Sequence, residues 1–215
     1  FLFFMALAPN VKWIKDKFRK IKVSNLLFFI ISIFISIKIV KISNTSYLFS
    51  TILFIFSFFL FFYTVKDFFN TSIKLSQKIA HFGFSILILS ILLNGSLSRE
   101  ITSNMQVGDK IEFLDKTIIF ESISIAEVKN YKSLSGKFLV RGKNNSHDFT
   151  PEVRIYNQPE IFTSEADIKT GILEDNFLVF NIVDNQYFNV RYQYKPFMML
   201  IWVSVLIISF GGVLA

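Results

Sequence analysis

The sequence predicts a multi-pass α-helical membrane protein with an inserted small antiparallel all-β domain. Hydrophobic residues make up 52% of its 215 residues, and 28 residues are phenylalanine, far above the composition of soluble proteins. Several apolar runs approach the ~20 residues that a helix needs to cross a bilayer. A polar stretch with frequent turn signals interrupts these runs. We therefore expect three parts: transmembrane helices in 1–96, an extracytoplasmic β domain in 97–195 and a C-terminal transmembrane helix in 196–215.

The first part is predicted to contain one partial helix and three complete spans. The partial helix covers 1–9 and leaves the membrane at Pro9. The complete spans are expected at about 26–40, 47–65 and 79–96. The first of them is short unless the long stem of Lys38 carries its ammonium group to the interface. Because the chain opens inside an apolar run without an initiator Met, we expect it to be a fragment of a longer polypeptide.

The charge distribution predicts the orientation of these helices. Residues 10–25 carry six basic side chains and one acidic one, and residues 66–78 carry three and one. Residues 97–195 hold 12 basic and 14 acidic side chains, so the positive excess lies outside the β domain. By the positive-inside rule both basic loops are cytoplasmic, and 97–195 is periplasmic in a bacterium. The basic loops therefore indicate topology in a lipid membrane; nucleic acid is not expected as a partner, since no aromatic-interleaved fold accompanies them.

The β domain is expected to contain roughly seven short strands, arranged as a sandwich or barrel. Gly108-Asp109 and Asp115-Lys116 punctuate its first hairpin, and Asp184-Asn185 marks a later hairpin turn. Residues 164–170 are expected to add a helical turn, with Ser164 as its cap.

The two histidines are the side chains with the most chemistry to offer. Cysteine is absent, so the chain supplies no thiolate ligand, disulfide or Cys nucleophile. His147 lies in the polar run NNSHDF and is expected to face solvent. His81 lies in the first turn of the predicted 79–96 span, where an ionisable side chain is costly without a partner. Neutral imidazole is also a common axial ligand of haem iron, and cofactor pockets form between helices.

Two interpretations of His81 remain open from the residues alone. Gly83 removes side-chain bulk beside it, so that a planar macrocycle or another helix can approach, and Ser85 shares its helix face. His81 either binds a haem as one axial ligand or hydrogen-bonds a neighbouring helix near the cytoplasmic interface. Glu165 and Asp167 are spaced too closely, without a visible pocket, to indicate an acid and base pair. No catalytic residue is assigned.

Short motifs stand in a fixed order along nearly the whole chain. Ile79-Ala80-His81-Phe82-Gly83 is followed by Asn94, Ser96, Ser98 and Glu100. The other motifs are Met5 to Pro9 with Trp13, Val107 to Asp109, Val128 to Tyr131, Pro151 to Tyr156, Ser164 to Ile168, Tyr194 to Phe197 with Ile201-Trp202, and Gly211-Gly212. Together they resemble the motifs of CcmF-type cytochrome c biogenesis proteins. The departures, all outside the histidine motif, are Met199 and Leu200, Val128 and Lys129, and Ser164.

The resemblance implies the C-terminal fragment of a haem lyase (cytochrome c synthase) subunit. In that family the histidine matching His81 is one axial ligand of a b-type haem in the membrane, which passes electrons, with quinol as their proposed source, to keep incoming haem reduced. The second axial ligand and a Trp-rich haem-handling segment are expected upstream of this fragment, which alone is therefore expected to be inactive. The implied partners are a haem chaperone, a thiol-presenting maturation subunit and apocytochrome c.

Two alternatives stay open at this point. One is a haem lyase dedicated to nitrite-reductase cytochromes, and the other is a membrane assembly scaffold or sensor that binds no cofactor. A bacterial inner (cytoplasmic) membrane and a mitochondrial inner membrane both suit the predicted topology.

Overall fold

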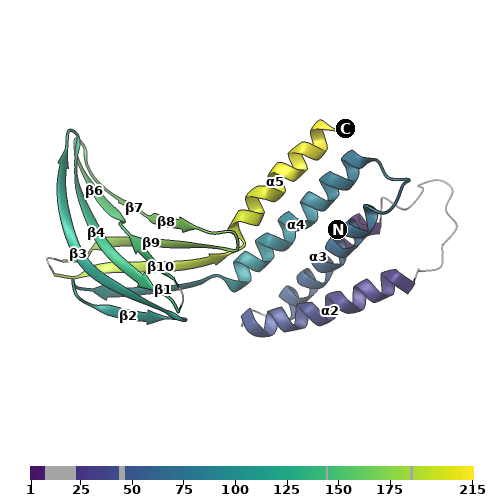
Figure 1. Cartoon of the computed structure of the whole chain (residues 1–215), viewed down its shortest axis with the longest axis horizontal. Coiled ribbons are helices and arrows are strands. Elements are labelled where there is room, and N and C mark those ends of the chain that lie inside the picture. The colour runs from purple at the N-terminus through teal and green to yellow at the C-terminus, as the bar shows by residue number, and fades with distance from the viewer. Residues whose placement is uncertain (8–22, 44–46, 144, 185) are drawn as a thin grey trace. The chain divides into compact units, whose positions relative to one another are not determined.

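The computed structural model describes residues 1–7, 23–43, 47–143, 145–184 and 186–215, which form two compact units (Figure 1). One unit is helical and comprises Phe1–Leu97 and Pro196–Ala215, and the other is the β unit Ser98–Lys195. The β unit is thus inserted into the helical unit along the chain. The predicted helix exit at Pro9 and most of the basic loop at 10–25 lie outside the described residues.

The described part of the helical unit contains five helices. They are α1 (Leu2–Leu7), α2 (Val23–Ser43), α3 (Tyr47–Asp67), α4 (Leu75–Leu97) and α5 (Met198–Val213). Three of them, α2, α3 and α4, are long and apolar enough to cross a membrane, and α5 is a shorter apolar helix. The α4 helix begins four residues earlier than predicted, because its first turn is mostly polar, with Ser76, Gln77 and Lys78, and an apolar pattern does not mark it. His81 therefore lies in the second turn of α4.

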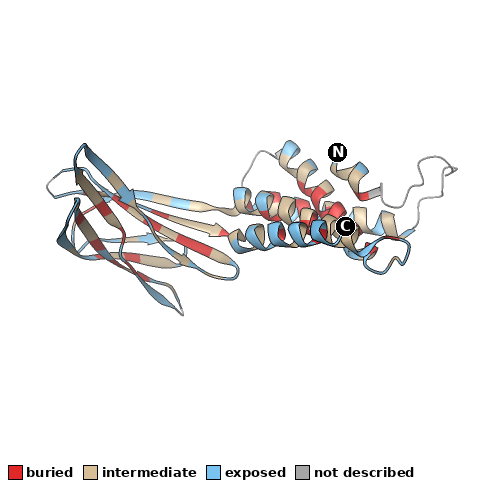
Figure 2. Ribbon diagram, turned by 90° about the horizontal axis from the view of Figure 1, so that it is seen from above, coloured by how far each residue is buried: buried red, intermediate tan, exposed pale blue. Residues whose placement is uncertain are grey.

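Small polar side chains share the interior of the helical unit with large apolar ones such as Phe54 and Leu60. Ser32, Ser36 and Ser57 are buried, whereas Phe34 is 62% exposed. Figure 2 shows buried positions in red and exposed positions in pale blue along the same helices. Each of these serine hydroxyls donates a hydrogen bond to the carbonyl four residues earlier, at 2.6–2.8 Å. Small residues between helices and large apolar side chains outside are typical of helices that pack within lipid. The predicted fold class is confirmed for the helical part.

The β unit is a sandwich of two antiparallel sheets. Its described strands are β1 (Arg99–Met105), β2 (Lys110–Phe113), β3 (Lys116–Val128), β4 (Tyr131–Arg141), β5 (Ser146–Phe149), β6 (Glu152–Asn157), β7 (Glu160–Glu165), β8 (Asp167–Thr170), β9 (Glu174–Ile182) and β10 (Phe188–Pro196). One sheet has the order β1-β10-β9-β8, and the other has the order β2-β3-β4-β6-β7 with β5 also paired to β4. The chain passes from one sheet to the other between β1 and β2, and it passes back between β7 and β8.

The core of the sandwich lies between the two sheets. Phe120 of β3 and Phe138 of β4 are cross-strand partners whose rings stack with centroids 4.2 Å apart. Phe180 of β9 meets both rings edge-on from the opposite sheet. Burial of these apolar side chains is the main driving force that holds the sheets together.

Two expectations for this unit are wrong. The described residues form ten strands and not about seven; β8, for example, lies where a helical turn was expected. Residues 164–170 do not form a helical turn with Ser164 as cap. Ser164 lies in β7 opposite Val153, and 167–170 form β8 paired to β9. Tertiary pairing here overrides the local turn and capping signal.

Candidate functional site

A short connection joins the end of α3 to the start of α4 (Figure 1). His81 lies in the second turn of α4, close to this connection. One turn away the two helices are linked by a hydrogen bond between Thr64 Oγ1 and Ser85 Oγ, which are 2.9 Å apart. Asp67 follows Thr64 by three residues, and His81 precedes Ser85 by four, so the antiparallel arrangement brings these two side chains to the same level. Asp67 is only 4% exposed and interacts electrostatically with His81. The histidine is thus half-buried beside a carboxylate.

Gly83 determines which side of α4 is closed. A Cβ added at Gly83 would lie 2.9 Å from side-chain carbons of both Ile207 and Ile208 on α5. A Cβ added at Gly211 would lie 2.6 Å from the backbone nitrogen of Ala80. The sequence left two partners open for Gly83, a planar macrocycle or another helix. In the structure the partner is helix α5, and no room remains for a macrocycle between α4 and α5.

The residues around His81 fit one axial haem ligand. No group of three or more His, Cys, Asp and Glu side chains gathers within the described residues, so side chains of this part alone do not form a metal cage. An axial site needs only one imidazole from this side of the iron. A metal-ligating histidine commonly donates its other ring N–H to a carboxylate, which sets its tautomer and orientation. The carboxylate that interacts with His81 is that of Asp67.

A second cluster gathers around Arg154 on the β unit. Arg154 Nε donates to Glu152 Oε2 at 3.1 Å, and its guanidinium carbon lies 5.2 Å from the ring centre of Tyr131. Glu165 lies 4.0 Å from the guanidinium. The hydrogen bond that Arg154 donates to Glu152 raises the pKa of Arg154 above its ordinary value, and a hydrogen bond with Tyr156 acts in the same direction. The cluster therefore brings together motif residues from β4, β6 and β7.

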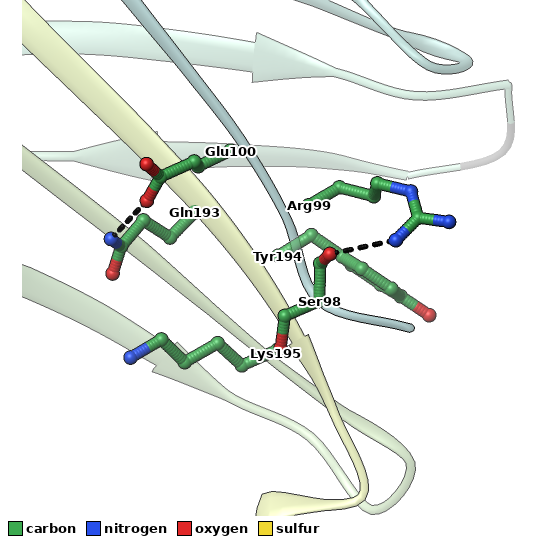
Figure 3. Close-up of a pocket in the computed structure, with 6 residues that line it drawn as sticks. All are labelled: Ser98, Arg99, Glu100, Gln193, Tyr194 and Lys195. Atoms are coloured by element: carbon green, nitrogen blue, oxygen red, sulfur yellow. Dashed lines mark hydrogen bonds between the residues drawn. The ribbon is translucent and has the colours of Figure 1, made fainter. Parts of the chain in front are cut away.

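A small open pocket of about 150 Å³ lies along β1 and β10. Figure 3 shows its lining residues, Ser98, Arg99, Glu100, Gln193, Tyr194 and Lys195. Glu100 Oε2 accepts hydrogen bonds from Arg191 at 2.6 Å and from Gln193 at 2.8 Å, and these bonds lower its pKa. The glutamate is ionised and already satisfied by its partners, so it is not poised as a general acid or base.

Two of the three remaining sequence candidates, His147 and Asp167, lie apart from these groups. His147 is exposed on β5. Asp167 accepts a hydrogen bond from the Thr150 amide at 2.7 Å and pairs with Lys169 at 3.1 Å. Glu165 belongs to the Arg154 cluster.

Sequence reasoning missed Asp67 and the Arg154 cluster. In the sequence Asp67 contributes only one negative charge to the loop between two predicted spans. An acidic residue at the end of one helix nevertheless lies close to the start of the next when the connection between them is short. The Arg154 cluster joins residues up to 34 positions apart (Tyr131 to Glu165), and only strand register reveals that they share a face. Another missed contact is the hydrogen bond from Asn94 Nδ2 to Pro196 O, 2.6 Å long, which joins the two ends of the helical unit that flank the insertion.

The fold and the site together define a class: a helical membrane protein with a β sandwich inserted before its last described helix and a half-buried histidine in the helix before the insertion. Residues 96–196 match a family model described as the CcmF C-terminal beta-sandwich. The chain is 29% identical over 141 residues to the cytochrome c-type biogenesis protein CcmF of Pseudomonas aeruginosa, covering 65% of this chain and 22% of that protein. It is 22% identical over 227 residues to CcmF of Escherichia coli, covering all of this chain and 35% of that protein.

A solved structure named cytochrome c heme lyase CcmF has the same fold. It superposes with a TM-score of 0.74 at 12% identity, over 99% of this chain and 37% of that one. The chain is therefore similar to a C-terminal portion of CcmF-type proteins, as the sequence motifs predict. It spans between about a fifth and a third of the length of the curated relatives named above.

Proposed function

We propose that this chain acts in cytochrome c maturation as part of the haem lyase, with His81 as one axial ligand of a b-type haem in the membrane. The observation that carries the proposal is the half-buried imidazole of α4 beside the buried carboxylate of Asp67. Its relatives are named for cytochrome c biogenesis, and its structural neighbour for haem lyase activity. An ionisable pair inside a membrane helix bundle calls for a functional explanation.

Each residue of the site then has a distinct task. His81 would present one imidazole nitrogen to the iron, and Asp67 would accept a hydrogen bond from the N–H of the other ring nitrogen and so fix the orientation of the ring. Packing of α5 against Gly83 and Ala80 closes one side of α4 and keeps lipid and water from that side. A bound haem would supply one-electron chemistry. In this proposal its electrons reduce the second haem, the one that is to be attached.

The rest of the machinery is proposed for the whole protein, of which this chain is a part. A second axial ligand comes from another part of the polypeptide, and this chain alone does not attach haem. The proposed partners are a haem chaperone, a thiol-presenting subunit, apocytochrome c and a quinol electron donor. In this proposal the membrane is a bacterial inner membrane or a mitochondrial inner membrane, and residues 97–195 lie on its outer face, because the basic excess lies in the other segments.

A reduced-minus-oxidised absorption spectrum of the purified full-length protein tests the proposal. A b-type band that falls in His81→Ala and persists in His147→Ala supports it, because His147 is exposed on the β unit. The two variants remove the same side chain from two environments. An equal band in both variants would overturn the role of His81.

A further inference from the structure

Two very short connections join one end of the sheet β1-β10-β9-β8 to apolar helices. Only Ser98 lies between the end of α4 and the start of β1, and only Phe197 lies between the end of β10 and the start of α5. One intervening residue spans at most about 7 Å. The α4 helix is long and apolar enough to cross a membrane, and α5 is a shorter apolar helix. This end of the sheet, which we call the connected end, is therefore held close to the membrane surface.

The turn between β8 and β9 lies at the connected end. Glu174, the first residue of β9, hydrogen-bonds to the side chain of Tyr194, two residues before the end of β10. Further along β9, the ring centre of Phe177 lies 4.9 Å from Lys195 Nζ. Figure 1 likewise shows β8 and β9 joined at the end of the sheet where β10 finishes. The turn at 171–173, which precedes Glu174, thus forms the tip of the sheet on the side where the chain continues into α5.

Two large apolar side chains occupy the middle of this turn. The backbone N–H of Gly171 donates to Glu174 O at 2.8 Å, so Ile172 and Leu173 are the two residues enclosed by the turn. Ile172 is 78% exposed and Leu173 is 63% exposed. Tight turns usually hold Gly, Pro, Asn, Asp or Ser at such positions. Neither turn chemistry nor packing within the described residues explains this pair, whereas an apolar environment outside the β unit does.

The neighbouring strands carry side chains that are typical of a membrane interface. Tyr194 and Lys195 lie near the end of β10, and Arg99, at the start of β1, is the cross-strand partner of Tyr194. Tyr is enriched where a membrane meets water. Lys and Arg can lay their stems along apolar surface while the charged group stays among water and headgroups. The connected end therefore combines an apolar tip with amphipathic side chains on the strands behind it.

We propose that the β8–β9 turn inserts Ile172 and Leu173 into the lipid bilayer, at the boundary between headgroups and acyl chains of the leaflet from which the β unit projects. Apolar side chains next to basic ones suit this boundary. Lipid is the occupant because the strands of this sheet are one residue away from helices α4 and α5. The contact is a third attachment of the sheet to the membrane, besides the two chain connections, and it limits tilting of the β unit over the bilayer.

Spin labelling of the full-length protein in lipid nanodiscs tests the proposal. A nitroxide is attached at Ile172→Cys, at Leu173→Cys or, as the control, at Val107→Cys, each in a protein that otherwise lacks cysteine. Val107 is 50% exposed in the turn that follows β1, at the opposite end of the same sheet. Power saturation in electron paramagnetic resonance measures collisions of the label with oxygen, which concentrates in lipid, and with a water-soluble nickel chelate. At 172 and 173 we expect more oxygen collisions than at 107 and about threefold or more fewer nickel collisions, because hydrocarbon excludes polar solutes.

The two collision rates separate lipid from the other possible surroundings of the turn. Low rates with both reagents at 172 and 173 would place the turn against a protein surface. Nickel rates equal to the rate at Val107 would place it in water. Either result would overturn the proposal.

A charged variant adds a second test in the same nanodiscs. With the label at Leu173→Cys, Ile172→Asp should raise the nickel collision rate towards the value at 107, because a carboxylate is costly among acyl chains. Val107→Asp, the matched control, should leave the rate at 173 unchanged. A rate that does not rise in Ile172→Asp, or that rises equally in both variants, would also overturn the proposal.

Discussion

At the residue scale, the carboxylate of Glu174 shows how polar contacts stabilise one end of the sandwich. Lys116 Nζ lies 3.2 Å from Glu174 Oε1 and 3.0 Å from Asn176 Oδ1, and Asn176 also accepts a hydrogen bond from Tyr192 at 2.7 Å. Burial alone would raise the pKa of Glu174, but hydrogen bonds from Asn176 and Lys116 outweigh it and hold the pKa below 4.5. Burial also raises the pKa of the Tyr192 hydroxyl, which stays protonated.

The lowered pKa predicts a loss of stability in acid. Because the folded state favours the ionised carboxylate, Glu174 stabilises the fold above its ordinary pKa of 4.5. This contribution is lost as the pH falls through the lower, folded-state value. We expect Glu174→Gln to flatten this acid limb, measured by hydrogen exchange of β9 between neutral and acid pH. Glu160→Gln, at the first residue of β7, is the control. An acid limb unchanged in Glu174→Gln would contradict the assignment.

Asp67 is the second prediction at this scale. Removing the carboxylate in Asp67→Asn leaves the His81 ring less firmly oriented and less electron-rich, so haem affinity falls by about 10–100-fold. The haem midpoint potential is also expected to rise, because a less basic imidazole stabilises ferric iron less. Redox titration of the full-length protein measures both the potential and the haem content. Asp67→Glu, which restores the carboxylate, recovers part of the effect; an unchanged potential in Asp67→Asn would exclude the orienting role.

At the element scale, close packing of α4 on α5 depends on two glycines. At Gly211 an added Cβ would meet backbone atoms of Ala80 at 2.6 and 2.9 Å, whereas at the neighbouring Gly212 nothing lies within 4 Å. Gly211→Ala therefore forces the helices apart and is expected to cost about 1–3 kcal/mol. Gly212→Ala is expected to be neutral or slightly stabilising. Thermal denaturation of the two full-length variants in detergent distinguishes them, and equal midpoints would contradict the packing described here.

Helices and sheet differ in how far the sequence predicts them. Apolar runs locate the membrane helices because lipid selects for length and hydrophobicity, but they miss polar helix ends. At the start of α2, Ser24 and Asn25 accept hydrogen bonds from Lys66 of α3, at 2.8 and 2.9 Å, and no apolar pattern marks these positions.

The strands are harder to predict because their pairing is set at long range. Ser164 carries a local helix-capping signal, yet its partner Val153 holds it in a strand. Of the site, His81 is predictable because an imidazole in an apolar run is conspicuous. Asp67 and Arg154 are not, because their roles depend on contacts across helices and strands.

At the scale of the whole molecule, the charge asymmetry predicts which surfaces face which compartment. The segments outside 97–195 hold 11 basic and 2 acidic side chains, so the turn between α3 and α4 is expected on the cytoplasmic side and the β unit on the other. A membrane-impermeant maleimide on intact cells should label Lys129→Cys and not Thr71→Cys, in a full-length protein that otherwise lacks cysteine. Both positions are exposed. Labelling of Thr71→Cys alone would reverse the topology.

The central claim is that His81 ligates haem iron, and ligand rescue tests it most directly. His81→Gly removes the imidazole and leaves space for an added ligand. The reduced-minus-oxidised spectrum of the full-length variant is recorded before and after addition of free imidazole. We predict that the b-type band is lost or shifted in the variant and is restored by imidazole, because the free ligand takes the vacant axial position. A band that is undiminished and unshifted in His81→Gly, and insensitive to imidazole, would contradict the claim.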